Sequence, residues 1–111
     1  MEIRASVRLL IPTLKREEVL EILYAMSQTT RYEEGCISCR VYRGEEIGEG
    51  NEIMLEEFWG DEKYFENHLR STDFHKVLLV SELSSAPPEF MFAKILSLSG
   101  IETIVTARTS P

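Results

Sequence analysis

The chain has 111 residues, of which 43% are hydrophobic and 28% are charged, a composition typical of one globular domain with a modest core. Its formal net charge of −7 argues against nucleic acid or an anionic membrane surface as a partner, because both attract clustered Lys and Arg. The sequence has no apolar run of roughly 20 residues, as a membrane span needs, and no secretory signal, so we expect a cytoplasmic protein.

The first two predicted elements are a half-buried strand over residues 3–11 and the helix that follows it. Every second residue of this strand is apolar, and Pro12 ends it. Thr13 is placed to cap the helix, whose inward face repeats at helical spacing. That face consists of Val19, Ile22, Leu23 and Met26.

Two further strands are expected over residues 36–43 and 52–59, separated by a glycine-rich acidic loop at residues 44–51. The loop lacks the regular ligand spacing of a calcium site, so we interpret it as a solvated connection. One face of the later strand carries Ile53, Leu55, Glu57 and Trp59, and the other carries Met54, Glu56 and Phe58.

The only cysteines, Cys36 and Cys39, are spaced C-x-x-C within the strand at residues 36–43. Residues three apart on a strand point to opposite faces, which disfavours a redox pair. No second C-x-x-C completes a zinc site, so we expect two unpaired, partly buried thiols and no metal.

The second half of the chain is predicted to hold a helix in two pieces and two more strands. Asp61 caps the first piece and Ser71 the second. A strand at residues 90–98 and a C-terminal strand at residues 101–108 follow a break at Pro87. The inward residues of the two helical pieces are Tyr64, Phe65, His68, Leu69, Phe74, Val77 and Leu78.

The predicted order is β-α-β-β-α-β, which is the ferredoxin-like arrangement of the α+β class, with both helices on one face of an antiparallel sheet. We expect one domain over residues 1–111, with a core at residues 3–98 and a strand extension at residues 100–108.

The face of the sheet without helices would expose apolar residues such as Met54 and Phe58, which is typical of an interface. We therefore expect a homodimer in which two sheets pack face to face, and the C-terminal strand could cross to the partner's sheet edge. Four strand residues could either bind an anionic ligand or neutralise carboxylates at that interface, and the sequence leaves both open: Arg4, Arg8, Arg40 and Tyr42.

Three residues carry the chemical hypothesis. Glu57 and Trp59 share one strand face, and His68 lies on the helix expected to pack over the sheet, so the three can converge in one cavity. A carboxylate raises the pKa of a neighbouring histidine and fixes its ring, as acid–base catalysis needs, and an indole suits a flat aromatic ligand. The alternative is that Glu57 and His68 only satisfy each other in the core and that Trp59 is a packing residue.

Two stretches resemble the antibiotic biosynthesis monooxygenase (ABM) family: E-E-G-C-I-S-C-R-V-Y at residues 33–42 and E-F-W-G-D-E-K-Y-F-E-N-H-L-R-S-T-D-F at residues 57–74. The resemblance extends from residue 3 to about residue 98, and residues 101–108 lie beyond the usual end of the family. The residues on the family pattern are Glu57, Trp59, His68, Leu69, Ser71 and Phe74.

The resemblance implies a dimeric α/β barrel of ferredoxin-like protomers and a monooxygenase that oxidises quinols or aromatic polyphenols with O₂, without a cofactor or metal. It further implies that His68 with Glu57 holds or removes a phenolic proton, while Trp59 and Phe65 flank the substrate ring. Leu55, where some oxygenating members carry an asparagine, and Phe74 complete the substrate-binding set.

Other activities in such a pocket remain open: an isomerase that uses His68 as its base, or a ligand-binding dimer without turnover. Haem degradation is disfavoured because the first strand has no asparagine, and His68 and Leu78 stand where that branch carries its tryptophan and iron ligand. A ring-sized cavity beside His68 would favour oxygenation, a small polar one isomerisation, and a filled core ligand binding alone.

Overall fold

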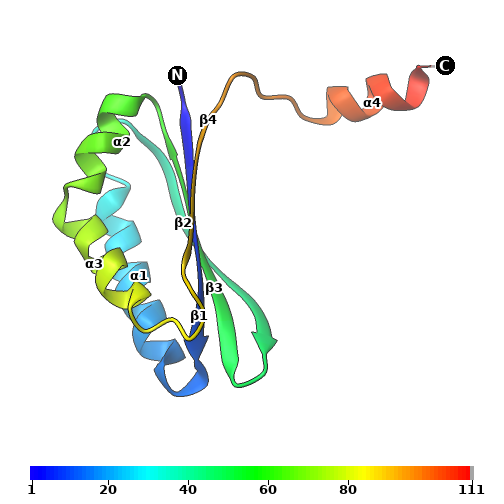
Figure 1. Cartoon of the computed structure of the whole chain (residues 1–111). Coiled ribbons are helices and arrows are strands. Elements are labelled where there is room, and N and C mark those ends of the chain that lie inside the picture. The colour runs from blue at the N-terminus through cyan, green and yellow to red at the C-terminus, as the bar shows by residue number, and fades with distance from the viewer. Residues whose placement is uncertain (111) are drawn as a thin grey trace.

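Four antiparallel strands carry three α-helices on one face in this computed structural model, which describes residues 1–110 (Figure 1). The strands are β1 (Ile3–Pro12), β2 (Cys36–Ile47), β3 (Gly50–Trp59) and β4 (Glu89–Lys94), in the sheet order β2-β3-β1-β4. The helices are η1 (Thr13–Lys15), α1 (Arg16–Thr30), α2 (Glu62–Leu69), α3 (Thr72–Ser81) and α4 (Ile101–Thr109). The predicted α+β, ferredoxin-like arrangement is confirmed.

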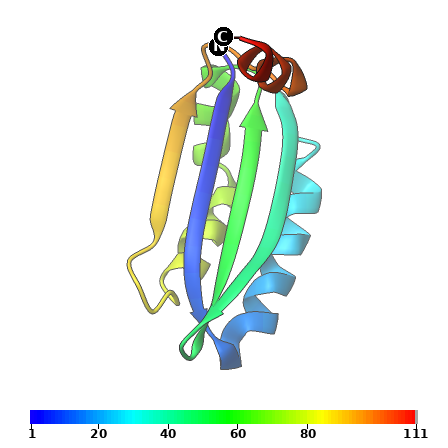
Figure 2. The same cartoon turned by 90° about the vertical axis from the view of Figure 1, so that its right-hand side faces the viewer.

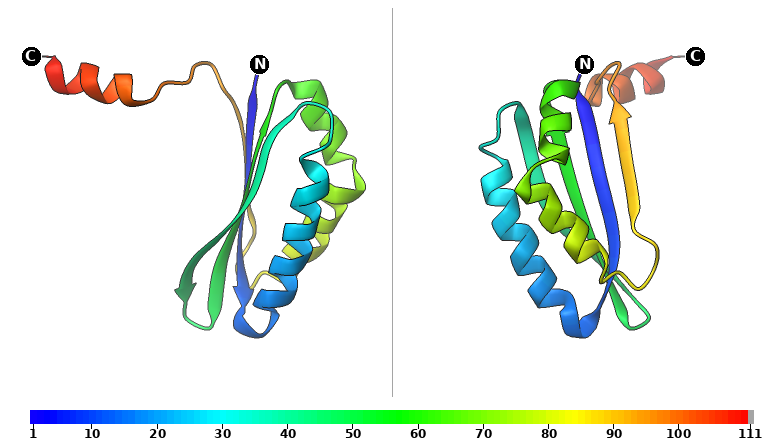
Figure 3. Two further views of the ribbon diagram at one scale, coloured as in Figure 1. Left: turned by 180° about the vertical axis from the view of Figure 1, so that it is seen from behind. Right: turned by 60° about the vertical axis from the view of Figure 1, so that its left-hand side comes forward.

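The core lies between the sheet and the helices α1, α2 and α3, which cover the same face (Figure 3). Period-two alternation places all five predicted apolar residues of β1 on that face, where they are buried. The helix pattern of α1 is also confirmed, because Val19, Leu23 and Met26 are fully buried. Leu78 of α3 is an exception to the predictions, since its side chain is exposed.

The opposite face of the sheet, here called the open face, is not covered by α1, α2 or α3 (Figure 2). Cross-strand pairing shows which side chains share it, because residues directly opposite each other in a sheet point the same way. It includes Arg4, Ser6, Arg8 and Leu10 of β1, Ser38, Arg40 and Tyr42 of β2, Met54, Glu56 and Phe58 of β3, and Glu89 and Met91 of β4.

The expected loop at residues 44–51 is wrong, because β2 and β3 continue through most of it. A bulge between Arg43 and Glu46 accommodates the extra length, and only two residues form the turn. Gly48 in that turn has a φ of +61°, which glycine adopts without strain.

Thr13 does not cap the first α-helix as predicted. Its hydroxyl instead donates to the carbonyl oxygen of Glu49 at 2.8 Å, which ties the start of the helix to the β2–β3 turn. The short helix η1 therefore precedes α1, and Lys15 at the N-cap of α1 makes no side-chain capping bond.

The predicted C-terminal strand at residues 101–108 is also wrong, because this segment forms α4. Ile101, Ile104 and Val105 recur at helical spacing, but they are also β-branched, as strand residues often are. The sequence of this segment is therefore compatible with a helix and with a strand. A helix satisfies its own backbone hydrogen bonds, whereas a strand needs a neighbour, and this segment projects away from the sheet (Figure 1). β4 ends at Lys94 because the residue opposite it is Ile3, where β1 begins.

Within residues 1–110, no helix has both the length and the apolar character needed to cross a lipid bilayer.

Candidate functional site

The two predicted helix caps position the helical part of the site. The carboxylate of Asp61 accepts a hydrogen bond from the amide of Glu62 at 2.9 Å, and α2 begins there. The hydroxyl of Ser71 accepts from the amide of Phe74 at 3.1 Å and starts α3. With α2 held in this way against the sheet, His68 in its last turn faces β3.

Glu57, Trp59 and His68 meet on the helix-covered side of the sheet, as expected. His68 Nε2 lies 3.0 Å from Glu57 Oε2, and the indole Nε1 of Trp59 donates to Glu57 Oε1 at 3.1 Å. The rings of Trp59 and His68 are stacked, with centroids 4.6 Å apart. The carboxylate of Glu57 therefore binds both aromatic neighbours at once.

Glu33 is a member of this site that the sequence reasoning missed. Its Oε2 lies 2.9 Å from Nδ1 of His68, so the imidazole bridges two carboxylates in what we call the Glu33–His68–Glu57 network. The Glu33 side chain is 26% exposed, whereas that of Glu57 is 3% exposed. Glu33 opens the quoted E-E-G-C stretch, but its residue type and spacing alone do not indicate its partner.

The turn that carries Glu33 depends on a glycine. Gly35 has a φ of +82°, and a Cβ there would collide with the Tyr64 ring of α2. Its carbonyl oxygen accepts from the amide of Gly60 at 2.8 Å, which joins the turn to the chain entering α2. The close approach of this turn to α2 brings Glu33 to His68.

The charges of the network favour a protonated histidine. Burial alone would lower the pKa of His68, but the hydrogen bonds and negative charges of Glu57 and Glu33 outweigh it, so this pKa is raised. Burial also raises the pKa of Glu33, by more than the neighbouring His68 lowers it. A carboxylate oxygen lies within hydrogen-bond distance of each ring nitrogen, so the geometry suits an imidazolium that donates from both.

The two cysteines lie on the same side of the sheet, which corrects the expectation that they point to opposite faces. A bulge between Cys36 and Ser38 shifts the register, so Cys36 is opposite Trp59 and Cys39 is opposite Glu57. Both thiols are unpaired, as predicted. Burial raises the pKa of Cys36 to about 11 and also raises that of Cys39, which disfavours the thiolate form of both.

The converging side chains fill the space between them. Glu57, Trp59 and His68 are 2%, 0% and 0% exposed, and they contact one another rather than surrounding an open cavity. Of the other predicted site residues, Phe74 packs near His68, with ring centroids 5.5 Å apart. Leu55 is buried in the main core cluster.

An apolar cleft of about 260 Å³ lies between α2 and β4, next to the Glu33–His68–Glu57 network but not continuous with it. Phe65 lines it and packs with Trp59 in one hydrophobic cluster, so this predicted site residue separates the cleft from the Glu33–His68–Glu57 network. Phe92 faces Phe65 at 5.1 Å between ring centroids. The remaining lining residues are Ile3, Glu62, Glu66, Leu69, Ala93 and Lys94.

The described residues contain no group of three or more His, Cys, Asp and Glu side chains arranged to bind a metal ion. Two of the three arginines on the open face are engaged within the chain: Arg4 pairs with Glu56 at 2.7 Å, and Arg8 contacts both Glu52 and Glu89.

Comparisons with known proteins agree with this architecture. The profile of the family described as antibiotic biosynthesis monooxygenase matches residues 3–78. The structure of Rv0793 from Mycobacterium tuberculosis is similar, with a TM-score of 0.75 and 24% identity over 90% of this chain and 100% of that chain.

Two further solved structures share the fold. A conserved protein from Methanosarcina mazei Go1 has a TM-score of 0.73 and 27% identity over 85% of this chain and 92% of its own. A protein from Nitrosomonas europaea, provisionally named as an antibiotic biosynthesis monooxygenase, has a TM-score of 0.73 and 15% identity, covering 89% of this chain and 94% of its own. No curated protein matches the chain significantly.

Proposed function

Because the chain belongs to the antibiotic biosynthesis monooxygenase family, we propose that it oxidises a quinol or an aromatic polyphenol with O₂ and without a cofactor. The observation that supports this proposal is the apolar cleft between α2 and β4, whose lining residue Phe65 packs in one hydrophobic cluster with Trp59, the residue that stacks on His68. Apolar walls with a few polar groups behind them are typical of sites for small aromatic ligands.

The proposed reaction needs no electron donor other than the substrate. A deprotonated quinol transfers electrons to O₂, one oxygen atom enters the ring, and the other leaves as water with protons from the substrate. The protein must therefore accept a phenolic proton and exclude bulk water from the reactive oxygen intermediates. Both tasks suit a carboxylate–histidine network behind an aromatic layer.

Each predicted site residue has a role in this proposal. Phe65 and Trp59 flank the ring, and one of the two must swing aside for the phenolic oxygen to approach Glu57. When His68 is protonated, Glu57 accepts the phenolic proton and His68 passes one of its own to Glu33, whose edge reaches solvent. Phe74 packs near His68 and supports its ring, and Leu55 belongs to the same core cluster as Phe74.

The filled space around His68 favours a second candidate, in which the protein binds an aromatic ligand in the same cleft without turnover. In that case the Glu33–His68–Glu57 network would only stabilise the packing of α2 on the sheet.

Oxygen uptake with a panel of hydroquinones tests the first candidate. We expect chelator-resistant uptake that falls at least about 100-fold in His68→Asn, because proton transfer typically contributes that much. The matched control is His75→Asn, which changes the other histidine, exposed on α3, and should keep the native rate. Equal rates in the two variants would refute the role of His68.

Ligand binding separates the two candidates. Trp59 is the only tryptophan, so its fluorescence reports a ring that enters the cleft beside it. Saturable quenching by a hydroquinone that is weakened by Phe65→Ala, without oxygen uptake in the native protein, would support binding alone. Quenching together with uptake would support the monooxygenase.

We also propose that two copies pair through their open faces. Of the charged side chains on the open face, Arg4, Arg8 and Arg40 match Glu52, Glu56 and Glu89 in number, so this face is neutral although the chain carries −7. Apolar Met54, Phe58 and Met91 lie among them. A neutral, partly apolar face is the part of an acidic protein best suited to contact a second copy.

A further inference from the structure

The last residues of the described chain form an extension that we call the C-terminal arm, residues 95–110. It leaves the sheet after β4, crosses six residues without regular structure and ends in α4. The amide of Ile95 donates to the carbonyl oxygen of Glu2 at 2.9 Å, and beyond that bond the arm projects to the open-face side of the sheet (Figure 1). No residue of α4 is buried.

The arm carries apolar side chains that nothing in its own chain covers. Five of them are between 55% and 86% exposed: Leu96, Leu98, Ile101, Ile104 and Val105. In α4, the last three and Arg108 recur at the i, i+3, i+4, i+7 spacing of one helix face. An isolated helix of nine residues is marginal in water, so this face needs an apolar surface to pack against.

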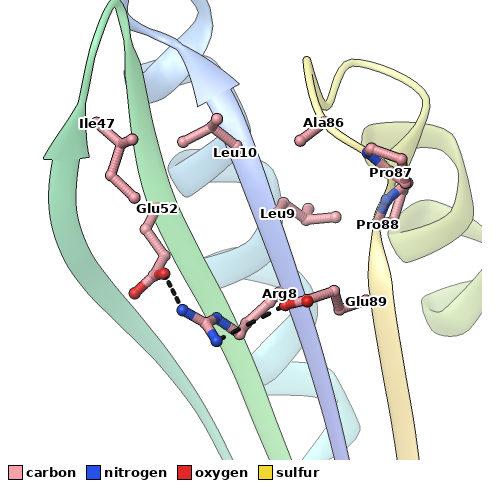
Figure 4. Close-up of a pocket in the computed structure, with 9 residues that line it drawn as sticks. All are labelled: Arg8, Leu9, Leu10, Ile47, Glu52, Ala86, Pro87, Pro88 and Glu89. Atoms are coloured by element: carbon pink, nitrogen blue, oxygen red, sulfur yellow. Dashed lines mark hydrogen bonds and ion pairs between the residues drawn. The ribbon is translucent and has the colours of Figure 1, made fainter.

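A hollow of about 410 Å³ on the open face offers such a surface (Figure 4). Leu10, Ile47, Pro87 and Pro88 form its apolar walls. Arg8 lies across it between two carboxylates, so its rim is acidic overall. The hollow thus combines apolar walls with negative charge, which complements a helix face of apolar residues followed by an arginine.

We propose that the C-terminal arm of one copy docks in this hollow on a second copy, with Ile101, Ile104 and Val105 against its apolar walls and Arg108 toward Glu52 and Glu89. The inference rests on the proposed pairing of two copies through their open faces, and it adds an exchange of arms to that contact.

The position of the arm favours a second copy over its own chain. The arm starts beside Lys94, which is opposite Ile3 at one end of β1, whereas Arg8 and Leu10 of the hollow belong to the other half of β1. Figure 2 shows α4 at one end of the sheet and the β2–β3 turn at the other. Ile47, which lines the hollow, directly precedes that turn. The arm would have to fold back along the whole sheet to fill the hollow of its own chain.

Photo-cross-linking in the full chain tests the docking directly. With benzoylphenylalanine at position 104, we expect a covalent dimer whose linked peptides contain residues 47–52 or 86–89 of the other copy. The same amino acid at position 106, on the opposite side of α4, should give at least about tenfold less covalent dimer. Cross-links within single chains only would show that the arm covers its own sheet and would refute the proposal.

Substitutions give an independent measurement by sedimentation velocity. Ile104→Asp on the arm and Ile47→Asp at the hollow should each weaken association at least about tenfold, whereas the matched control Thr106→Asp should not. All three side chains are exposed in the single chain, so folding should be unaffected, and circular dichroism checks this.

Two results would distinguish failure of the proposed arm exchange from failure of the proposed pairing of open faces. A native dimer that Ile104→Asp leaves intact, without cross-links from position 104, would refute the exchange of arms while the pairing of open faces stands. A native protein that sediments as a monomer at all concentrations would refute both.

Discussion

His68 is held between two glutamates, and this makes the stability of the fold depend on pH. Because the pKa values of His68 and Glu33 are both raised, the folded chain binds protons more tightly than the unfolded chain. The contribution of His68 is fully present below about pH 6.5, the ordinary histidine value, and is lost as the pH rises through its raised pKa. The free energy of unfolding should therefore fall above neutral pH.

Glu57→Gln tests this dependence. Removing the carboxylate lowers the pKa of His68, so the fall in the free energy of unfolding should move to lower pH and become smaller. Urea denaturation at a series of pH values measures it. Glu56→Gln is the matched control, because it changes the next residue on the opposite face of β3, and it should keep the native profile. Identical profiles in both variants would contradict the assigned charge state of His68.

The direction in which a side chain points was predicted correctly where a single periodic pattern determines it. Strict alternation on β3 placed Glu57 and Trp59 together, and helical spacing placed His68 above them. It failed for Cys36, because a one-residue bulge reverses every side chain before it and no residue type marks this bulge. It also failed for Glu33, because the partner of a turn residue depends on how the turn folds in three dimensions.

The turn before β2 contains Gly35 and brings Glu33 to His68. Gly48, in the β2–β3 turn, also has a positive φ, so the two glycines can be compared to test how much the contact of Gly35 with α2 matters. Gly35→Ala adds both backbone strain and a collision with Tyr64, whereas Gly48→Ala adds only the strain, since nothing lies within 4 Å of its added Cβ. Gly35→Ala should therefore lower the free energy of unfolding by about 1–3 kcal/mol more than Gly48→Ala, as overpacking typically costs.

Thermal or urea denaturation of the two glycine variants measures this difference. Equal losses would show that Tyr64 moves aside freely and that the turn does not rely on its contact with α2.

Elements were predictable where caps and periodicity agreed. Asp61 and Ser71 capped α2 and α3 as expected, whereas the hydroxyl of Thr13 bonds to the carbonyl oxygen of Glu49, more than 30 residues along the chain, and so could not be assigned from local sequence. The segment at residues 101–108 fits both strand and helix periods, and the absence of a neighbouring strand decided for α4. Local sequence therefore predicts a helix or strand reliably only where contacts with distant segments do not decide between two possibilities.

At the scale of the whole molecule, the element order was enough to predict the sheet with helices on one face, because few topologies connect these elements with short loops. The proposed pairing of open faces can be tested at this scale. Met91→Glu places a charge in the expected contact and should increase the dissociation constant at least about tenfold in sedimentation velocity. Leu79→Glu is the control, because Leu79 is 51% exposed on α3, against 60% for Met91, and lies on the helix layer.

If Leu79→Glu dissociates the protein and Met91→Glu does not, the helix layer is the interface and the proposed pairing is wrong.

If two copies pair through their open faces as proposed, the neutrality of that face also limits how far assembly proceeds. Joining two copies through it hides no net charge, so the pair displays twice −7 on its outer surfaces. We therefore expect collisions between such pairs to be repulsive at low ionic strength, so that growth into larger aggregates stops at two chains. We expect added salt to weaken this barrier between pairs and to affect the seam within each pair, whose charges balance, much less.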